Sequence, residues 1–165
     1  MAYEMKVDGM AAISEQLSQL EDKAPAVAAM ALYDGAGIMA DEVRKSAEAI
    51  KTGPGSSRND ARYATPEEKE IVLKAAAGIA KFRKNGTEVD TSVGFRNAGY
   101  TQLNGKTVPI PLIVNSINSG TSFMHKQPFI RKASNSGGKK AIKKMQETVE
   151  TEWQKIYRET IGNIK

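Results

Sequence analysis

SGTSFMHKQPFIRKA, residues 119–133, is the segment of this chain that most restricts its architecture. Gly120-Thr121 indicates an exposed turn. Pro128 suits the start of a helix whose first turn then carries Phe129 and Ile130. We interpret the segment as a structural joint that leads into a helical C-terminus, and it carries no catalytic motif.

C-terminal to this joint, the sequence predicts a short helix over 128–135, a break at Gly137-Gly138 and a last helix from Lys139. The last helix has an apolar stripe at helical spacing: Ile142, Met145, Val149, Trp153 and Ile156. Lys139, Lys140, Lys143 and Lys144 fall in its first turns. The helix dipole disfavours cations there, so we expect these lysines to meet acids or phosphates elsewhere.

N-terminal to the joint, helical spacing predicts a helix over 9–22, an interruption at Ala24-Pro25 and a long helix over 25–51. The apolar stripe of the long helix is Leu32, Ala36, Met39, Val43, Ala47 and Ile50. Gly35 and Gly37 interrupt it. They indicate either the close approach of another segment or only a weak point in the helix.

The middle of the chain predicts loops, one helix and a hairpin. Residues 52–57 form a loop, and Thr65-Pro66-Glu67-Glu68 is a capping box that begins a helix over 66–84. Residues 87–95 alternate as a half-buried strand, Asn104-Gly105 is a hairpin turn, and 108–117 is a second strand.

These elements predict an α+β fold in a single domain over 1–165. A small antiparallel sheet would pack against the helix 25–51 and the C-terminal helix. The segment 54–84, a loop followed by a helix, would be an addition to that arrangement.

Composition limits the possible functions. The 165 residues include no cysteine, which excludes disulfides and thiolate chemistry. The net charge of +5 is uneven: −5 over residues 1–50, +4 over 51–125 and +6 over 126–165. An acidic front and a basic back suit nucleic-acid binding, head-to-tail contact between copies, or merely helix faces that differ. We expect no signal peptide and no membrane span.

Motifs for chemistry are weak. Gly99 and Gly105-Lys106-Thr107 narrowly miss a phosphate-binding loop, because five residues separate the glycines instead of four and two prolines follow closely. His125 is the only histidine and has no evident partner for catalysis or metal binding. Acidic pairs such as Glu67/Glu68 fit a helix N-terminus. We therefore predict no catalytic residue, no cofactor and no metal site.

Taken in order, several short features resemble a known family. They are Gly9 before the first helix, the Ala-rich helix, Thr52-Gly53 after it, a hairpin, Gly120-Thr121 and the Pro-Phe-Ile-Arg turn at 128–131. This order resembles the tail-completion, or head–tail joining, proteins of long-tailed bacteriophages. The chain departs from the family pattern in two places. Residues 54–84 are inserted before the hairpin, and Asn118-Ser119 replaces an acidic and an aromatic residue.

The resemblance implies a non-enzymatic virion protein that forms a ring, for example a hexamer, in the neck. Its partners would be other copies of itself, the tail tube and the head connector, with a passing contact to DNA. It would reside in the virion, and in the host cytoplasm during assembly. We expect the contact residues to be Arg58, Arg62, Asn104, Gly105, Gly120, Thr121, Phe123, Pro128 and Phe129.

A second hypothesis is a basic nucleic-acid-binding protein. It would bind phosphates through Lys139, Lys140, Lys143 and Lys144, and its affinity would fall steeply with salt.

Overall fold

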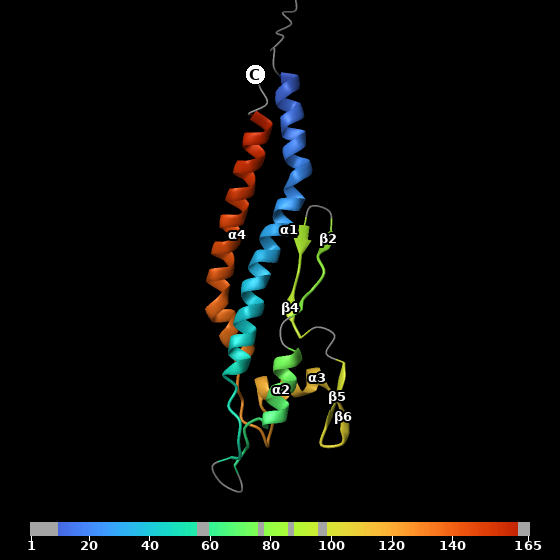
Figure 1. Cartoon of the computed structure of the whole chain (residues 1–165), viewed down its shortest axis with the longest axis vertical. Coiled ribbons are helices and arrows are strands. Elements are labelled where there is room, and N and C mark those ends of the chain that lie inside the picture. The colour runs from blue at the N-terminus through green and yellow to red at the C-terminus, as the bar shows by residue number, and fades with distance from the viewer. Residues whose placement is uncertain (1–9, 56–59, 76–77, 86–87, 96–98, 162–165) are drawn as a thin grey trace, which may run out of the picture.

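Two long helices that lie side by side and run in opposite directions dominate the chain (Figure 1). In the computed structural model, the described residues are 10–55, 60–75, 78–85, 88–95 and 99–161. Helix α1 is Met10–Glu48 and helix α4 is Phe129–Ile161. With 39 residues in α1, the helix is about 58 Å long at a rise of 1.5 Å per residue. The predicted α+β class, with a long helix packed on the C-terminal helix and on small antiparallel sheets, is confirmed.

The two helices approach closely where each has a glycine. A Cβ placed on Gly35 of α1 would lie 2.7 Å from Cγ of Met145 in α4. Conversely, a Cβ on Gly137 of α4 would lie 2.9 Å from Sδ of Met39 in α1. A methionine from each helix therefore occupies the space that a side chain would need on the other helix. Of the two meanings left open for Gly35, close approach is correct, whereas Gly37 faces open space.

Polar contacts join the helices at three levels: Lys23 with Glu159, Asp34 with Thr148, and Glu42 with both Ser136 and Lys140. The Glu42 carboxylate accepts hydrogen bonds from Ser136 Oγ at 2.6 Å and from Lys140 Nζ at 2.8 Å. The bonds from Lys140 and Ser136 hold the pKa of Glu42 below its ordinary value of 4.5. These contacts fix one antiparallel register.

Both predicted interruptions of the long helices are wrong. Helix α1 continues through Pro25, because proline has a helical φ and packing of α1 against α4 outweighs both the lost bond to the carbonyl of Glu21 and the clash of the ring with that carbonyl. Helix α4 continues through Gly137-Gly138, because packing against α1 stabilises a backbone that glycine alone would weaken. The predicted helix over 9–22 rested on apolar residues at helical spacing, Met10, Ile13, Leu17 and Leu20, and their side chains lie outside the described structure.

A single bent hairpin, here called the arm, runs along α1. It consists of β1 (Gly78–Ile79), β2 (Arg83–Asn85), β3 (Glu88–Asp90) and β4 (Val93–Gly94). Ile79 pairs with Val93, but Arg83 pairs with Asp90, so the register shifts by one residue between them. Lys81 and Phe82 together oppose Thr91, which is a β-bulge.

The arm corrects two predictions. Helix α2 is only Pro66–Ala75, and the expected continuation to residue 84 belongs to β1 and β2. The expected strand 87–95 is divided into β3 and β4. Ile79 and Phe82 were placed on a helix because the bulge gives a three-residue spacing to side chains that both pack toward α1.

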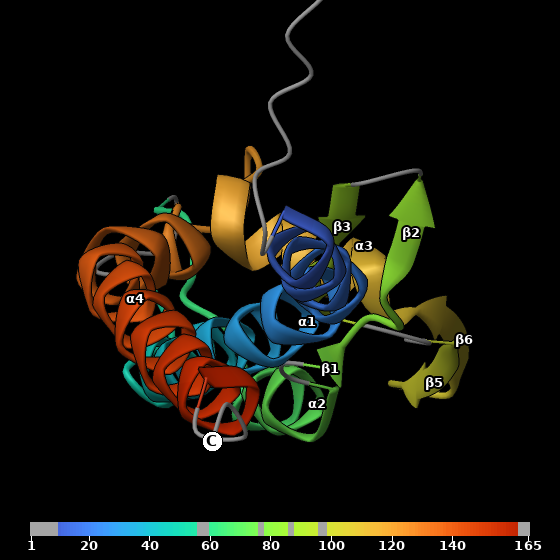
Figure 2. The ribbon, with the colours of Figure 1, turned by 90° about the horizontal axis from the view of Figure 1, so that it is seen from above.

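Seen along the long helices, the upper part of the molecule has three layers in the order α4, α1, arm (Figure 2). Ala40 and Val43 of α1, together with Ala133 of α4, form a small buried cluster. Ile79 and Val93 of the arm pack against this cluster. The ring of Phe82 lies 6.2 Å from that of Tyr33 in α1. Helix α1 is therefore the central layer.

The larger core lies at the lower end, where α2, β5 (Tyr100–Leu103), β6 (Lys106–Pro109) and α3 (Ile110–Ser119) meet the ends of α1 and α4 (Figure 1). Its buried residues are Ala47, Ile50, Ala64, Val72, Ile113, Val114, Ile117, Met124 and Phe129. Phe95 meets Phe129 edge to face, with ring centroids 5.9 Å apart. Lys69 of α2 caps the C-terminus of α1 by donating to the carbonyls of Glu48 and Ile50.

The predicted strand 108–117 is also wrong. After the short strand β6 the chain enters α3, whose first turn holds Pro111. Proline needs no donor partner at that position, so it starts a helix. Ile113, Val114 and Ile117 are buried at helical spacing, and Leu112 is exposed. The Asn104-Gly105 turn is confirmed, with both residues at positive φ.

Adjacent glycines in α4 provide a matched test of the close helix contact. A Cβ at Gly137 would overlap Met39, whereas one at Gly138 meets nothing within 4 Å. Both alanines improve helix propensity by about 1 kcal/mol. The overlap costs roughly 1–3 kcal/mol. We expect Gly138→Ala to be more stable than Gly137→Ala by about that cost, measured by urea denaturation.

Truncating the opposing side chain is the control. Met39→Ala should reduce the difference between the two alanine variants, because it removes Sδ of Met39 and leaves only Cγ and Cβ of Glu42, at 3.0 Å and 3.2 Å, close to the added Cβ. Equal stabilities of Gly137→Ala and Gly138→Ala in the otherwise unchanged chain would contradict the close contact.

Candidate interaction site

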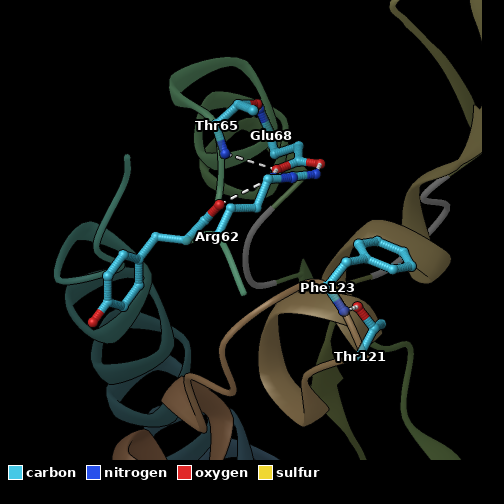
Figure 3. Close-up of polar contacts among 6 residues, drawn as sticks. Arg62, Thr65, Glu68, Thr121 and Phe123 are labelled. Atoms are coloured by element: carbon cyan, nitrogen blue, oxygen red, sulfur yellow. Dashed lines mark hydrogen bonds and ion pairs between the residues drawn. The ribbon is translucent and has the colours of Figure 1, made fainter. Parts of the chain in front are cut away.

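The turn Thr121–Met124, here called the Phe123 turn, is held against the segment that precedes α2. The N–H of Arg62 donates to the carbonyl of Phe123 at 2.9 Å, and the N–H of His125 donates to the carbonyl of Arg62 at 2.8 Å. Within the turn, Thr121 and Met124 form a mutual bridge. The N–H of Phe123 also donates to Thr121 Oγ1 at 3.4 Å (Figure 3). The turn is thus fixed from both sides.

Arg62 is anchored in turn by a buried carboxylate. Its guanidinium donates two hydrogen bonds of 2.7 Å to Glu68. Figure 3 shows the Arg62 and Glu68 side chains together with Thr65, which a dashed line joins to Glu68. The N–H of Thr65 donates to Glu68, and the N–H of Glu68 donates to Thr65 Oγ1, so the predicted capping box is confirmed. The Glu68 side chain is almost fully covered. This arrangement ties the start of α2 to the Phe123 turn.

Two opposing effects set the ionisation of Glu68. Burial raises the pKa of this carboxyl, but the hydrogen bonds from Arg62 and Thr65 and the charge of Arg62 together outweigh burial. The pKa of Glu68 therefore lies below its ordinary value of 4.5. Glu68 is ionised at neutral pH, and it supports the fold only in that form.

The Phe123 turn presents a large apolar side chain to solvent. Phe123 is 62% exposed although its main chain is held at both ends. Gly120, which precedes the turn, has φ of 77° and caps α3. A Cβ at Gly120 would lie 3.0 Å from the main chain of Lys126, so only glycine fits. A rigidly held, exposed aromatic residue is typical of a protein-contact site.

The structure distributes the other predicted contact residues unevenly. Phe129 is 2% exposed and belongs to the core, so it is a packing residue. Arg62 is used internally by Glu68. Pro128 directly precedes α4 and accepts the first helical bond from Lys132. Arg58 lies outside the described residues.

Asn104 and Gly105 are exposed at the tip of the β5–β6 hairpin. The contacts of the described residues join Arg62 to the Phe123 turn but do not extend to that tip. The predicted contact residues therefore do not form one continuous site.

The four predicted DNA-binding lysines are all exposed on α4. They lie about three turns inside the helix, not in its first turns, because α4 begins at Phe129. The argument from the helix dipole is therefore wrong. Lys140 already binds Glu42 at 2.8 Å, and Lys143 lies 3.9 Å from Glu147.

A groove between α1 and the arm is a second surface, and the sequence did not indicate it. Its volume is about 750 Å³, and its lining is Tyr33, Gly37, Ala40, Asp41, Arg44 and Ile79–Phe82. The sequence predicted a helix over 66–84 and therefore no arm. Without the arm, the groove between the arm and α1 could not be predicted. The sequence did contain a signal for the arm. The pair Asn85-Gly86 favours a hairpin turn as strongly as a helix end, and the prediction of a helix over 66–84 took it as a helix end.

His125 lies beside Tyr63 and Asp60. His125 stacks on Tyr63 with ring centroids 4.7 Å apart, and its Nε2 lies 3.6 Å from Asp60. That distance is longer than a hydrogen bond. In the part of the chain that the structure describes, no three His, Cys, Asp or Glu residues form a cluster that could hold a metal ion. No helix among the described residues is long and apolar enough to cross a membrane.

Comparison with known proteins finds no matching family model, no matching curated protein and no matching solved structure. The functional proposal therefore rests on the residues of this chain and their geometry.

Glu68 generates a pH-dependent prediction. Since its folded pKa is lowered, its contribution to stability is full above pH 4.5 and is lost as the pH falls through the folded pKa. We expect Glu68→Gln to cost roughly 2 kcal/mol at pH 7, allowing for the partial exposure of Arg62. The variant should also lose less stability than the wild type between about pH 5 and pH 3, measured by urea denaturation.

Glu70→Gln is the control, because its partner Lys74 and Glu70 itself are both largely exposed. It should change stability little at neutral pH. A wild type and Glu68→Gln variant with the same pH profile would contradict the role assigned to Glu68.

Proposed function

We propose that the chain is a non-enzymatic structural subunit of the phage virion neck. It would assemble as a closed ring that completes the tail and joins it to the head connector. The supporting observation is a layered subunit with apolar side chains exposed on two different outer faces. The resemblance of the sequence to tail-completion proteins supplies the biological setting.

The two faces belong to opposite layers. On the arm side of α1, Tyr33 is 56% exposed beside Phe82 at the groove. On α4, Ile142 is 54% exposed, and Tyr157 is exposed further along the same helix. Helix α1 separates the two layers (Figure 2). We call these surfaces the arm face and the α4 face.

Two different faces on one subunit favour head-to-tail assembly. When the arm face of one copy meets the α4 face of the next, each copy still has one face available. Such contacts generate a ring if the rotation closes. The groove on the arm face has small residues, Gly37 and Ala40, on its floor, which would admit a side chain of a neighbour closely.

Charge has a smaller role than composition suggested. The acidic N-terminal segment 1–50 and the basic C-terminal segment 126–165 lie side by side in one molecule, since α1 packs on α4. Glu42 binds Lys140 and Lys23 lies near Glu159 within the chain. Contacts between copies would therefore depend mainly on apolar area and only weakly on salt.

The lower end would contact the other neck proteins. It presents Phe123 on its held turn and the exposed tip Asn104-Gly105. These side chains are separate from the arm face and the α4 face, so a ring could form while they remain accessible. We assign them to contact with the tail tube or the head connector.

Blocking one face at a time tests the ring. We expect Tyr33→Glu and Ile142→Glu each to abolish ring formation, because a charge would be buried at the interface. Mixed together, the two variants should bind each other through the one pair of intact faces, without forming a ring. Light scattering and native mass spectrometry of the purified proteins measure both results.

Leu112→Glu is the matched control, since Leu112 is 56% exposed on α3 and lies on neither face. It should assemble like the wild type. Normal rings from both face variants would overturn the proposal, as would failure of the two variants to bind each other.

One observation favours nucleic-acid binding as a second function. Between Arg131 and Lys144, α4 carries six bases and no acid: Arg131, Lys132, Lys139, Lys140, Lys143 and Lys144. Lys139 and Lys143 lie one turn apart on the same side of the helix. DNA could meet this segment as it passes through a neck.

Salt dependence tests this second function. Wild-type chain should bind duplex DNA at low salt, and Lys139→Gln with Lys143→Gln should weaken binding and reduce the slope of log affinity against log salt by about 2. No binding of the wild type at low salt would exclude it.

A further inference from the structure

The outer edge of β5 has main-chain groups that the hairpin does not use. Ile110 donates its N–H to the carbonyl of Gly99 at 3.0 Å, so residues 99 and 110 are a hydrogen-bonded pair. Because bonded pairs alternate along an antiparallel ladder, Thr101–Val108 and Leu103–Lys106 are bonded as well. The N–H and C=O groups of Tyr100 and Gln102 must then point away from β6. Among the described residues, no other main-chain group bonds to them.

Most strand edges in this chain carry a feature that discourages pairing with another chain. β2 contains Arg83 and Lys84, and β3 contains Glu88 and Asp90. β6 contains Lys106 and also Pro109, which lacks an N–H on the outward side. Charges and proline are the usual protection of an edge. β1 and β4 have only two residues each.

β5 is the exception among the described strands. Its sequence, Tyr-Thr-Gln-Leu, has neither a charge nor a proline over four residues. Leu103 packs against the main core, which fixes the hairpin in place. Tyr100 is 74% exposed, and Gln102 is exposed on the same face. The outer edge of β5 is therefore fixed in place and uncharged, and it lacks the features that protect the other strand edges.

We propose that β5 pairs with β5 of a second copy of this chain across a two-fold axis. The two strands would run antiparallel, with Tyr100 opposite Gln102 of the partner subunit and the axis at Thr101. Both outward N–H and C=O pairs of each strand are then used, and the two hairpins become one four-stranded sheet. A second copy suits this edge because an uncharged strand meets itself without repulsion.

This contact does not depend on the proposed ring. The ring would use the arm face and the α4 face, whereas β5 lies at the lower end of the molecule (Figure 1). The Tyr33→Glu variant, which should not form rings, can therefore isolate the β5 contact. In that background the chain should be a concentration-dependent dimer.

Gln102→Pro in the Tyr33→Glu background tests the pairing. It removes the outward N–H of Gln102 and the hydrogen bond from Gln102 Nε2 to Thr107 Oγ1, but leaves the main-chain bonds within the hairpin intact. We expect the dimer dissociation constant to rise by at least about tenfold, since two main-chain bonds are lost across the axis. Thr107→Pro is the matched control. It removes the outward N–H of Thr107 in β6, and like Gln102→Pro it removes the bond between Gln102 Nε2 and Thr107 Oγ1. The dimer should remain intact, because the proposed contact uses β5 and not β6.

Amide hydrogen exchange on the Tyr33→Glu chain supplies a measurement that no folding defect can obscure. The amides of Tyr100 and Gln102 should become protected as the protein concentration rises. Those of Thr101 and Leu103, bonded within the hairpin, should be protected throughout. A monomeric Tyr33→Glu chain, or a dimer in which Tyr100 and Gln102 exchange freely, would overturn the pairing and leave the ring proposal untouched. A wild-type chain that forms no ring, together with protected β5 amides in the Tyr33→Glu chain, would overturn the ring proposal and leave the pairing intact.

Discussion

The close approach of α1 and α4 is the constraint on which the rest of the structure depends. Two helices of this length cannot bury a core by themselves, so they must interlock closely where they meet. Met145 over Gly35 and Met39 over Gly137 achieve this contact, once from each side. The bond from Lys140 to Glu42 lies beside the second contact and sets the register. A larger residue at either glycine would force the side chains packed on it to move.

The rest of the chain is positioned from this pair. The lower core closes around the end of α1 and the start of α4, where Ile50 and Phe129 are buried together. The side chain of Gln127 donates to and accepts from the main chain of Lys51, which links the two helices at that end. The arm packs along the side of α1 that α4 leaves uncovered. The outcome is a subunit with α4 exposed on one side and the arm groove on the other, and these are the two faces that the proposed ring would use.

Local signals predicted the parts of the fold that depend on local chemistry. The capping box at Thr65–Glu68 and the Asn104-Gly105 turn are correct because a few adjacent residues suffice to form them. Pro25 and Gly137 were misjudged because packing between distant segments outweighs their helix penalty. The arm was missed because a bulge imitates helical spacing.

In the candidate site, sequence identified the exposed Phe123, but it could not show that Phe129 is buried or that Arg62 binds Glu68. Those outcomes depend on segments that meet only in the folded chain.

The central claim is that neighbouring copies meet arm face to α4 face. The chain has no cysteine, so thiols can be introduced singly or in pairs without background. The most direct measurement is cross-linking of a Tyr33→Cys/Ile142→Cys chain with a short bismaleimide, with each single cysteine variant as a reference. The account predicts a ladder of covalent oligomers that ends at the ring for the double variant, and no cross-linked pairs for either single variant. Dimers from a single variant, or a double variant linked only within one chain, would contradict it.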